Sequence, residues 1–107
     1  MRRNTLGELE QIVMATAMRL GDRAYGVSII DDIRGRTGRQ VSTGPLSVTL
    51  DRLEEKGLIE SRYADALEGR GKRPRRYVKV TALGRRALKD SRDVMLAVWR
   101  GLESALK

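Results

Sequence analysis

The chain has 107 residues, of which 34% are charged, and a formal net charge of +8. It contains neither cysteine nor histidine, which excludes disulfides and thiolate or imidazole metal sites, so we expect no metal and no cofactor. The length fits one compact domain, and 40% hydrophobic residues without any phenylalanine predict an aliphatic core.

No apolar run approaches the roughly 20 residues of a membrane span. The first ten residues, MRRNTLGELE, lack the apolar segment of a signal peptide. We therefore expect a cytoplasmic protein with no membrane partner. No acidic pair lies beside a nucleophile motif, and no Gly-Lys-Ser/Thr sequence is present to cradle a phosphate, so we also expect no enzymatic activity.

Two helices are predicted in the first 38 residues. Apolar residues recur at spacings of three and four from residue 6 to 20, with Thr5 and Glu8 expected to cap the start and Gly21 to end the helix. A second, shorter helix follows Tyr25-Gly26 and is expected to end at Gly35 or Gly38. Its inward face is predicted to consist of Val27, Ile30 and Ile33.

A third helix is predicted from Ser42 or Thr43, either of which can cap it, to Gly57. Pro45 is tolerated because the first helical turn has unpaired N–H groups anyway. The buried stripe is expected to consist of Leu46, Leu50 and Leu53. The opposite, outward face is then formed by Gly44, Ser47, Val48, Asp51 and Arg52.

Residues 58–63 and 76–81 alternate in polarity around a glycine-containing loop, which predicts a β-hairpin. Thr81 is expected to cap a last helix that runs nearly to Lys107. Three helices, a hairpin and a long helix describe an α+β, mostly α fold: a winged helix-turn-helix with a C-terminal dimerisation helix. The predicted organisation is a DNA-binding domain at residues 1–81 and a dimerisation helix at residues 82–107.

The positive charge is concentrated in the hairpin loop. Residues 1–65 carry ten basic and ten acidic residues, whereas residues 66–80 carry six basic residues and one acidic residue. A solvated loop is one interpretation, but a concentrated patch favours a polyanionic partner, nucleic acid before membrane. In a winged helix the hairpin tip reaches the DNA backbone, so we expect phosphates to lie opposite these arginines.

Several stretches resemble the PadR family of bacterial transcriptional regulators. They are YGVSIIDDI, VSTGPLSVTLDRLEEKGLIES and GRGKRPRRYVKVTALGRRAL, and the resemblance covers residues 6–88. It implies a homodimeric repressor with an N-terminal winged helix and, as in the short branch of the family, a single C-terminal helix. Ser47 stands where the family usually has a tyrosine.

The expected partner is double-stranded DNA. We assign Ser42, Thr43 and Ser47 to phosphate or base edges and Arg52 to phosphate or guanine. Phosphate contacts are expected from the remaining predicted residues, Tyr25, Arg70, Lys72, Arg73 and Arg75. Alternatives stay open at several positions: Ser42 and Thr43 as simple caps, Tyr25 as a core residue, Asp51 paired with an arginine or with cytosine, and Arg76 turned away by strand alternation.

A second copy of the chain is the other expected partner. Met95, Val98, Leu102 and Ala105 are spaced by three, four and three residues, which is the seam of a helix that pairs with another helix. Trp99 lies beside this stripe, where it adds bulk to the seam. A sharper hypothesis is that two Trp99 rings flank a gap for a small, planar, apolar effector.

Three functions compete. The first is a dimeric, sequence-specific repressor of an inverted-repeat operator. The second is a winged-helix interaction module whose basic loop binds an acidic protein or RNA. The third is a nonspecific nucleoid-type binder. Small polar residues and an arginine on the third helix favour the first, and the neutral first 65 residues disfavour the third.

Overall fold

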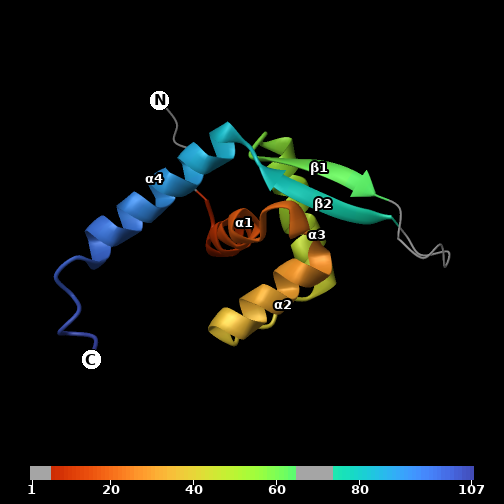
Figure 1. Cartoon of the computed structure of the whole chain (residues 1–107). Coiled ribbons are helices and arrows are strands. Elements are labelled where there is room, and N and C mark those ends of the chain that lie inside the picture. The colour runs from red at the N-terminus through yellow and green to blue at the C-terminus, as the bar shows by residue number, and fades with distance from the viewer. Residues whose placement is uncertain (1–5, 65–73) are drawn as a thin grey trace.

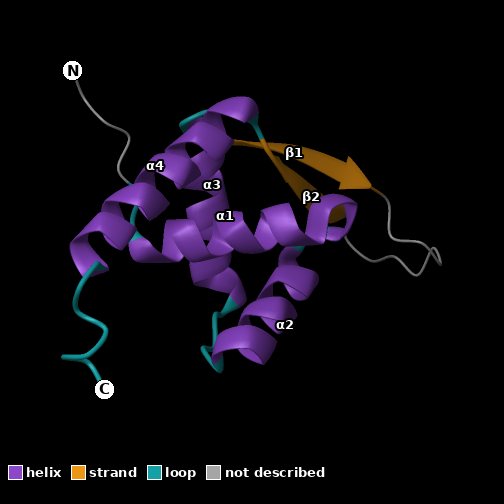
Figure 2. Cartoon of the chain, turned by 60° about the vertical axis from the view of Figure 1, so that its left-hand side comes forward, coloured by secondary structure: helices purple, strands orange, loops and turns teal. Residues whose placement is uncertain are grey.

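The computed structural model describes residues 6–64 and 74–107. Its elements in chain order are α1 (Glu8–Leu20), the 3-10 turn η1 (Gly21–Arg23), α2 (Gly26–Thr37), α3 (Thr43–Glu55), β1 (Ile59–Ala64), β2 (Arg75–Val80) and α4 (Ala82–Trp99). Helix α1 lies at the centre and contacts α2, α3, α4 and β2 (Figures 1 and 2). The predicted order of three helices, a hairpin and a last helix is confirmed.

The core is aliphatic, as the composition predicts. Its largest fully buried side chains are Met14, Ile29, Ile33, Leu53, Leu58 and Val13. They come from α1, α2, α3 and the turn before β1, so the first three helices and the hairpin share one core. Helix α4 adds only its first turns, through buried Gly84 and Ala87 and half-buried Leu88.

Two details of the first helices differ from the prediction. Helix α1 begins at Glu8 after the N-cap Gly7, whose N–H donates to the Glu10 carboxylate at 2.8 Å. The expected capping pair is therefore wrong for Glu8, and Thr5 lies outside the described residues. On α2, Val27 is 55% exposed. A separation of two residues turns it about 200° from Ile29, which takes the inward position instead.

Glycines end α2 and α3 as expected. Gly38 adopts the left-handed conformation at the end of α2, with φ 74°. Gly57 does so after α3, with φ 76°, and its N–H donates to the Glu54 carbonyl at 2.9 Å. The next N–H, of Leu58, reaches the Leu53 carbonyl, which closes the helix and sends Leu58 into the core.

The hairpin is antiparallel, with Ile59 opposite Val80 and Ala64 opposite Arg75. Each strand lies one residue closer to the tip than the sequence predicts. The free edge of β2 also pairs with the residue before α2, through a bridge between Tyr25 and Tyr77. This contact ties the middle of β2 to the start of α2, and nothing in the local sequence pattern predicted it.

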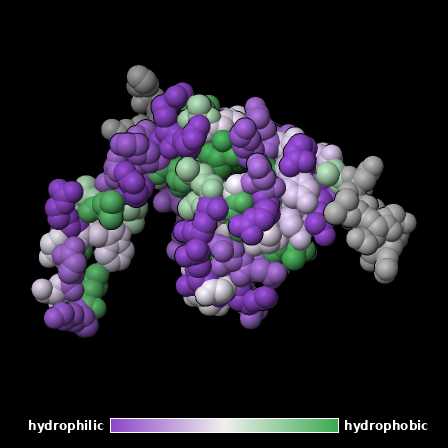
Figure 3. Space-filling view, in the orientation of Figure 1, coloured by the Kyte–Doolittle hydropathy of each residue, from purple (hydrophilic) through white to green (hydrophobic). Residues whose placement is uncertain are grey.

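Helix α4 is shorter than expected. Thr81 caps its start by accepting from the Gly84 N–H at 3.0 Å, as predicted. The helix ends at Trp99 and not near Lys107, because Gly101 adopts φ 87° and residues 100–107 form turns. Its 18 residues span about 27 Å. The C-terminal part of α4 projects from the body (Figures 1 and 2), and Figure 3 shows hydrophobic residues along the projecting segment.

Candidate nucleic-acid interface

Helix α3 presents the outward face that its apolar stripe predicts. Leu46, Leu50 and Leu53 are buried, and Thr49 completes the buried side. The exposed face comprises Gly44, Ser47, Val48, Asp51 and Arg52. Helix α2 packs against α3, so the pair forms a helix-turn-helix with α3 as its outer helix.

The N-terminal end of α3 is open to solvent. Ser42 is the N-cap residue and Thr43 opens the helix, both are exposed, and Ser42 makes no side-chain capping bond. The first-turn N–H groups and the helix dipole favour an anion there. No acidic residue lies in that turn. This end of α3 therefore has the chemistry of a phosphate or base-edge contact.

Of the four wing residues predicted to contact phosphate, Arg75 is the one among the described residues. Arg70, Lys72 and Arg73 lie outside the described residues. Arg75 is described, and its guanidinium carbon lies 4.5 Å from the centre of the Tyr25 ring. Arg75 also approaches the Tyr77 hydroxyl, with 3.4 Å between its nitrogen and that oxygen. The structure thus places two predicted contacts, Arg75 and Tyr25, side by side, with Arg75 at the loop end of the paired strands.

Sequence reasoning missed two members of this group. The Tyr25 and Tyr77 ring centres are 5.3 Å apart, and the Arg62 guanidinium carbon lies 4.8 Å above the Tyr77 ring. Arg62 and Tyr77 face each other because they are opposite in the strand register. Pairing the two alternating strands residue by residue identifies this partnership, but the register is needed first.

The neighbouring Arg76 turns the other way, toward α3. It donates to Asp51 at 2.8 Å, to Glu54 at 2.8 Å and to the Ser61 hydroxyl at 2.9 Å. Of the two alternatives for Asp51, pairing with an arginine is confirmed. Hydrogen bonds from Ser61 and Arg76 hold the pKa of Glu54 below its ordinary value.

Arg52 lies on the flank of α3 that faces α1. Partial burial raises the pKa of Glu10, but the Gly7 N–H, Lys56 and the charge of Arg52 outweigh it and lower the pKa below 4.5. Lys56 donates to the Glu10 carboxylate at 3.0 Å. Arg52 is exposed, and its positive charge acts on the Glu10 carboxylate of α1.

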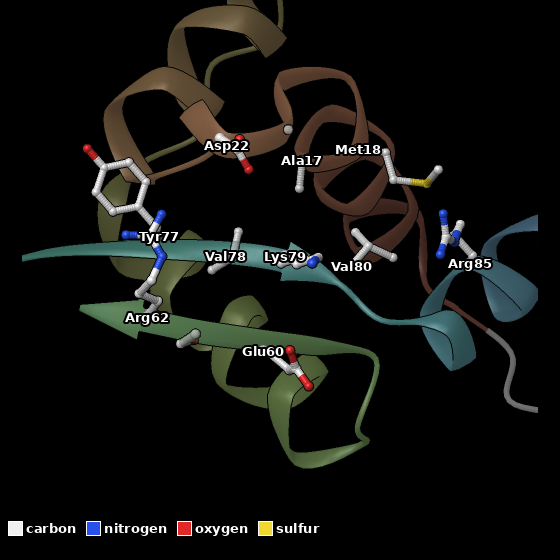
Figure 4. A pocket seen from close by; sticks show the side chains of 12 residues that line it. Ala17, Met18, Asp22, Glu60, Arg62, Tyr77, Val78, Lys79, Val80 and Arg85 are labelled. Atoms are coloured by element: carbon white, nitrogen blue, oxygen red, sulfur yellow. The ribbon is translucent and has the colours of Figure 1, made fainter. Parts of the chain in front are cut away.

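An open groove lies between the hairpin and the segment formed by α1 and η1 (Figure 4). Arg62 and Tyr77 stand at one end and Arg85 of α4 at the other, with Glu60 and Lys79 between them. Asp22 of η1 forms part of the facing wall. Charges of both signs line the groove, so it lacks the uniform potential of an anion site.

A second groove, more apolar, lies between α1 and α4. Ile12, Ala15 and Met18 line it from α1, and Leu88, Met95 and Leu96 line it from α4. Beyond the groove, Val98 and Trp99 are 63% and 47% exposed. Of the expected dimerisation residues, Met95, Val98 and Trp99 lie on α4. The expected helical seam is wrong at Leu102 and Ala105, which follow the end of the helix.

No helix within residues 6–64 and 74–107 is long and apolar enough to cross a membrane.

Comparison with known proteins places the chain in a family. The model of the transcriptional regulator PadR-like family matches residues 17–90. A protein of Lysinibacillus sphaericus, named uncharacterized protein X, is 35% identical over 86 residues, which span 78% of this chain and 74% of that protein.

Solved structures resemble the fold over most of its length. A PadR family transcription regulator from Clostridium difficile R20291 is 22% identical, with a TM-score of 0.73 over 94% of this chain and 100% of that one. A PadR family transcriptional regulator from Eggerthella lenta is 25% identical, with a TM-score of 0.71 over 94% and 87% of the two chains. The chain therefore belongs to the PadR-like family of transcriptional regulators, and it is a DNA-binding regulator and not an enzyme.

Proposed function

We propose that the protein is a homodimeric repressor that acts in the cytoplasm on an inverted-repeat operator. Residues 1–81 would form the DNA-binding domain and residues 82–107 the dimerisation segment. The observation that carries the proposal is the open N-terminal end of α3, with exposed Ser42, Thr43 and Ser47, next to a hairpin whose tip carries the main excess of positive charge.

In this arrangement α3 enters the major groove. Ser42, Thr43 and Ser47 contact phosphates or base edges, and Arg52 reaches a phosphate or a guanine from the flank. The wing residues Arg70, Lys72, Arg73 and Arg75 follow the backbone. Tyr25 supports Arg75 through the contact between its ring and the Arg75 guanidinium, and its hydroxyl contacts a phosphate of the same DNA strand.

The wing is tested by replacing Arg70, Lys72, Arg73 and Arg75 with alanine. Binding to every DNA sequence should weaken, because phosphate contacts carry no sequence information. The slope of log affinity against log salt should fall by about 0.9 for each lost contact. Arg86→Ala is the matched control, since this exposed arginine lies on α4. An unchanged salt slope in the wing variant removes the wing from the interface.

Dimerisation rests on the apolar surface that α4 leaves exposed. Five of the six positions from 94 to 99 carry large apolar side chains that are each at least 42% exposed, namely Val94, Met95, Leu96, Val98 and Trp99. Such a patch on a small protein marks an interaction surface. The groove between α1 and α4 offers a complementary site for the same helix of a second copy. Two-fold symmetry would then set two α3 helices about one DNA turn, ~34–36 Å, apart.

Truncation after Ser91 tests this assignment. The α4 residues that contribute to the core, Gly84, Ala87 and Leu88, all remain in the shortened chain. The truncated protein should therefore fold, sediment as a monomer and lose tight operator binding. A shortened chain that still sediments as a dimer contradicts the role of α4.

A small, planar, apolar effector is the remaining part of the proposal. Trp99 is the single tryptophan of the chain and lies at the end of α4, half-exposed. In a dimer seam, two such rings can hold a flat molecule between them. Binding there would change the spacing of the α3 helices and release the operator.

A further inference from the structure

We propose that Arg76 is a positioning residue, which holds α3 against the wing and neutralises two carboxylates on the DNA-facing side of α3 without touching DNA. The inference rests on the proposed function, in which α3 and the wing bind one DNA site together. It assigns a role to a wing arginine whose neighbours are expected to contact phosphate.

All three nitrogens of the Arg76 guanidinium donate hydrogen bonds. Nη1 donates to Asp51, Nη2 to Glu54 and Nε to the Ser61 hydroxyl, each at 2.8–2.9 Å. The Ser61 hydroxyl in turn donates to Glu54. One side chain of β2 therefore ties together α3 and β1, and the fork of arginine suits the two carboxylates better than a lysine would.

Strand alternation explains why adjacent arginines take opposite tasks. Arg75 points to the face that carries Tyr25 and Tyr77. Arg76 points to the face that carries Val78, which is buried in the core. Its side chain is only 18% exposed, whereas those of Asp51 and Glu54 are 68% and 47% exposed. The carboxylates thus reach the surface and the arginine lies beneath them.

The acidic residues in the second half of α3 give Arg76 its role in DNA binding. The second half of α3 carries three acidic residues, Asp51, Glu54 and Glu55, against Arg52 alone. Asp51, Glu54 and Arg76 line a concave surface between α3 and the hairpin, together with exposed Val48 and Tyr63. Without Arg76, two uncompensated carboxylates would lie beside DNA phosphates and repel them.

A double-mutant cycle separates this role from a direct phosphate contact. The four proteins are the unmodified chain, Arg76→Ala, the double variant Asp51→Asn with Glu54→Gln, and the triple variant. Binding is measured to an operator selected from random DNA. Arg76→Ala should weaken binding by roughly tenfold when both carboxylates are present, the scale of coupling within one ion-pair network. The same change should weaken it less than about twofold when they are amides.

A direct phosphate contact predicts a different pattern. The loss would then be equal in both backgrounds, and the salt slope would fall by about 0.9 in each. Equal losses overturn the inference, as does the absence of any loss in the first background. Thermal unfolding confirms that each variant is folded at the assay temperature. If Arg76→Ala is not, Arg76→Gln takes its place in the cycle.

A measurement without DNA keeps the inference distinct from the proposed function. Titration of the Glu54 carboxyl by NMR should show its pKa rising when Arg76 is replaced, and no rise overturns the inference. If the unmodified chain prefers no DNA sequence, the proposed function fails, while the titration still decides whether Arg76 holds the carboxylates of α3.

Discussion

The packing of α4 against the Leu58 backbone depends most closely on Gly84. A Cβ atom added there would lie 2.1 Å from the Leu58 carbonyl oxygen, whereas ordinary contacts begin at 3.4 Å. Gly84→Ala must therefore move α4 or the Leu58 backbone by about 1.3 Å. Two hydrogen bonds lie in the same segment. The Thr81 N–H donates to the Leu58 carbonyl at 3.0 Å, and the Thr81 hydroxyl donates to the Gly57 carbonyl at 2.8 Å.

The free energy of unfolding should fall by roughly 3 kcal/mol, because a contact of 2.1 Å with a backbone oxygen places the overpacking cost at the upper end of its range. Overpacking costs about 1–3 kcal/mol, and a weakened backbone hydrogen bond adds about 1 kcal/mol. The higher helix propensity of alanine offsets about 1 kcal/mol. For a domain of this size, the loss corresponds to a decrease in Tm of roughly 15 °C. Tm is measured by circular dichroism at one protein concentration, because dimerisation makes Tm depend on concentration.

Gly35→Ala is the matched control. Gly35 lies within α2, is exposed, and has nothing within 4 Å of an added Cβ. Alanine there should raise the unfolding free energy by about 0.5–1 kcal/mol, because it removes only backbone freedom from the unfolded chain. If Gly84→Ala is as stable as the unmodified chain while Gly35→Ala behaves as expected, the close approach of α4 to Leu58 is refuted.

Three further predictions concern DNA, pH and the effector. Arg52→Ala should narrow the difference in affinity between operator and random DNA, by about 1–3 kcal/mol if Arg52 reads guanine; an equal loss for both DNAs in a competition assay makes Arg52 a phosphate anchor only. The pKa of Glu10 is lower in the folded protein than its ordinary value of 4.5. Its ionised carboxylate therefore stabilises the fold at pH values above 4.5, and this stabilisation is lost as the pH falls through the folded pKa. Glu10→Gln should therefore show a smaller decrease in Tm on acidification, and an identical pH profile would exclude the Glu10 contacts from stability. Planar aromatic compounds that release the protein from DNA should quench Trp99 fluorescence, and release with an unchanged signal would place the effector site elsewhere.

The local sequence predicts most of the fold because each element carries its own signals. Apolar spacing identifies the helices, and glycines that adopt the left-handed conformation at positions 38 and 57 end two of them. Alternation predicts the hairpin to within one residue. Of the two partners left open for Asp51, an arginine and a cytosine, the structure shows the arginine.

Errors arose where local signals were weak. The apolar residues after Trp99 continue the helical spacing, but Gly101 adopts a φ of 87° and the helix ends before it. Val27 was assigned to the core because its spacing matches Ile30 and Ile33, but Ile29, on the opposite side of the helix from Val27, takes the inward position together with Ile33. In both places an apolar residue type was taken for a buried one.

The amino-acid sequence by itself determined the winged helix-turn-helix, the outward face of α3 and the concentration of positive charge in the wing. These follow from interactions among residues near one another in the chain. Only the tertiary structure decided which arginine faces which partner. Arg75 meets Tyr25 from a segment 50 positions earlier, and Arg76 meets Asp51 from 25 positions earlier. Such contacts depend on strand register and on the position of β2 between β1 and Tyr25, and a difference of one residue in register would exchange the two arginines.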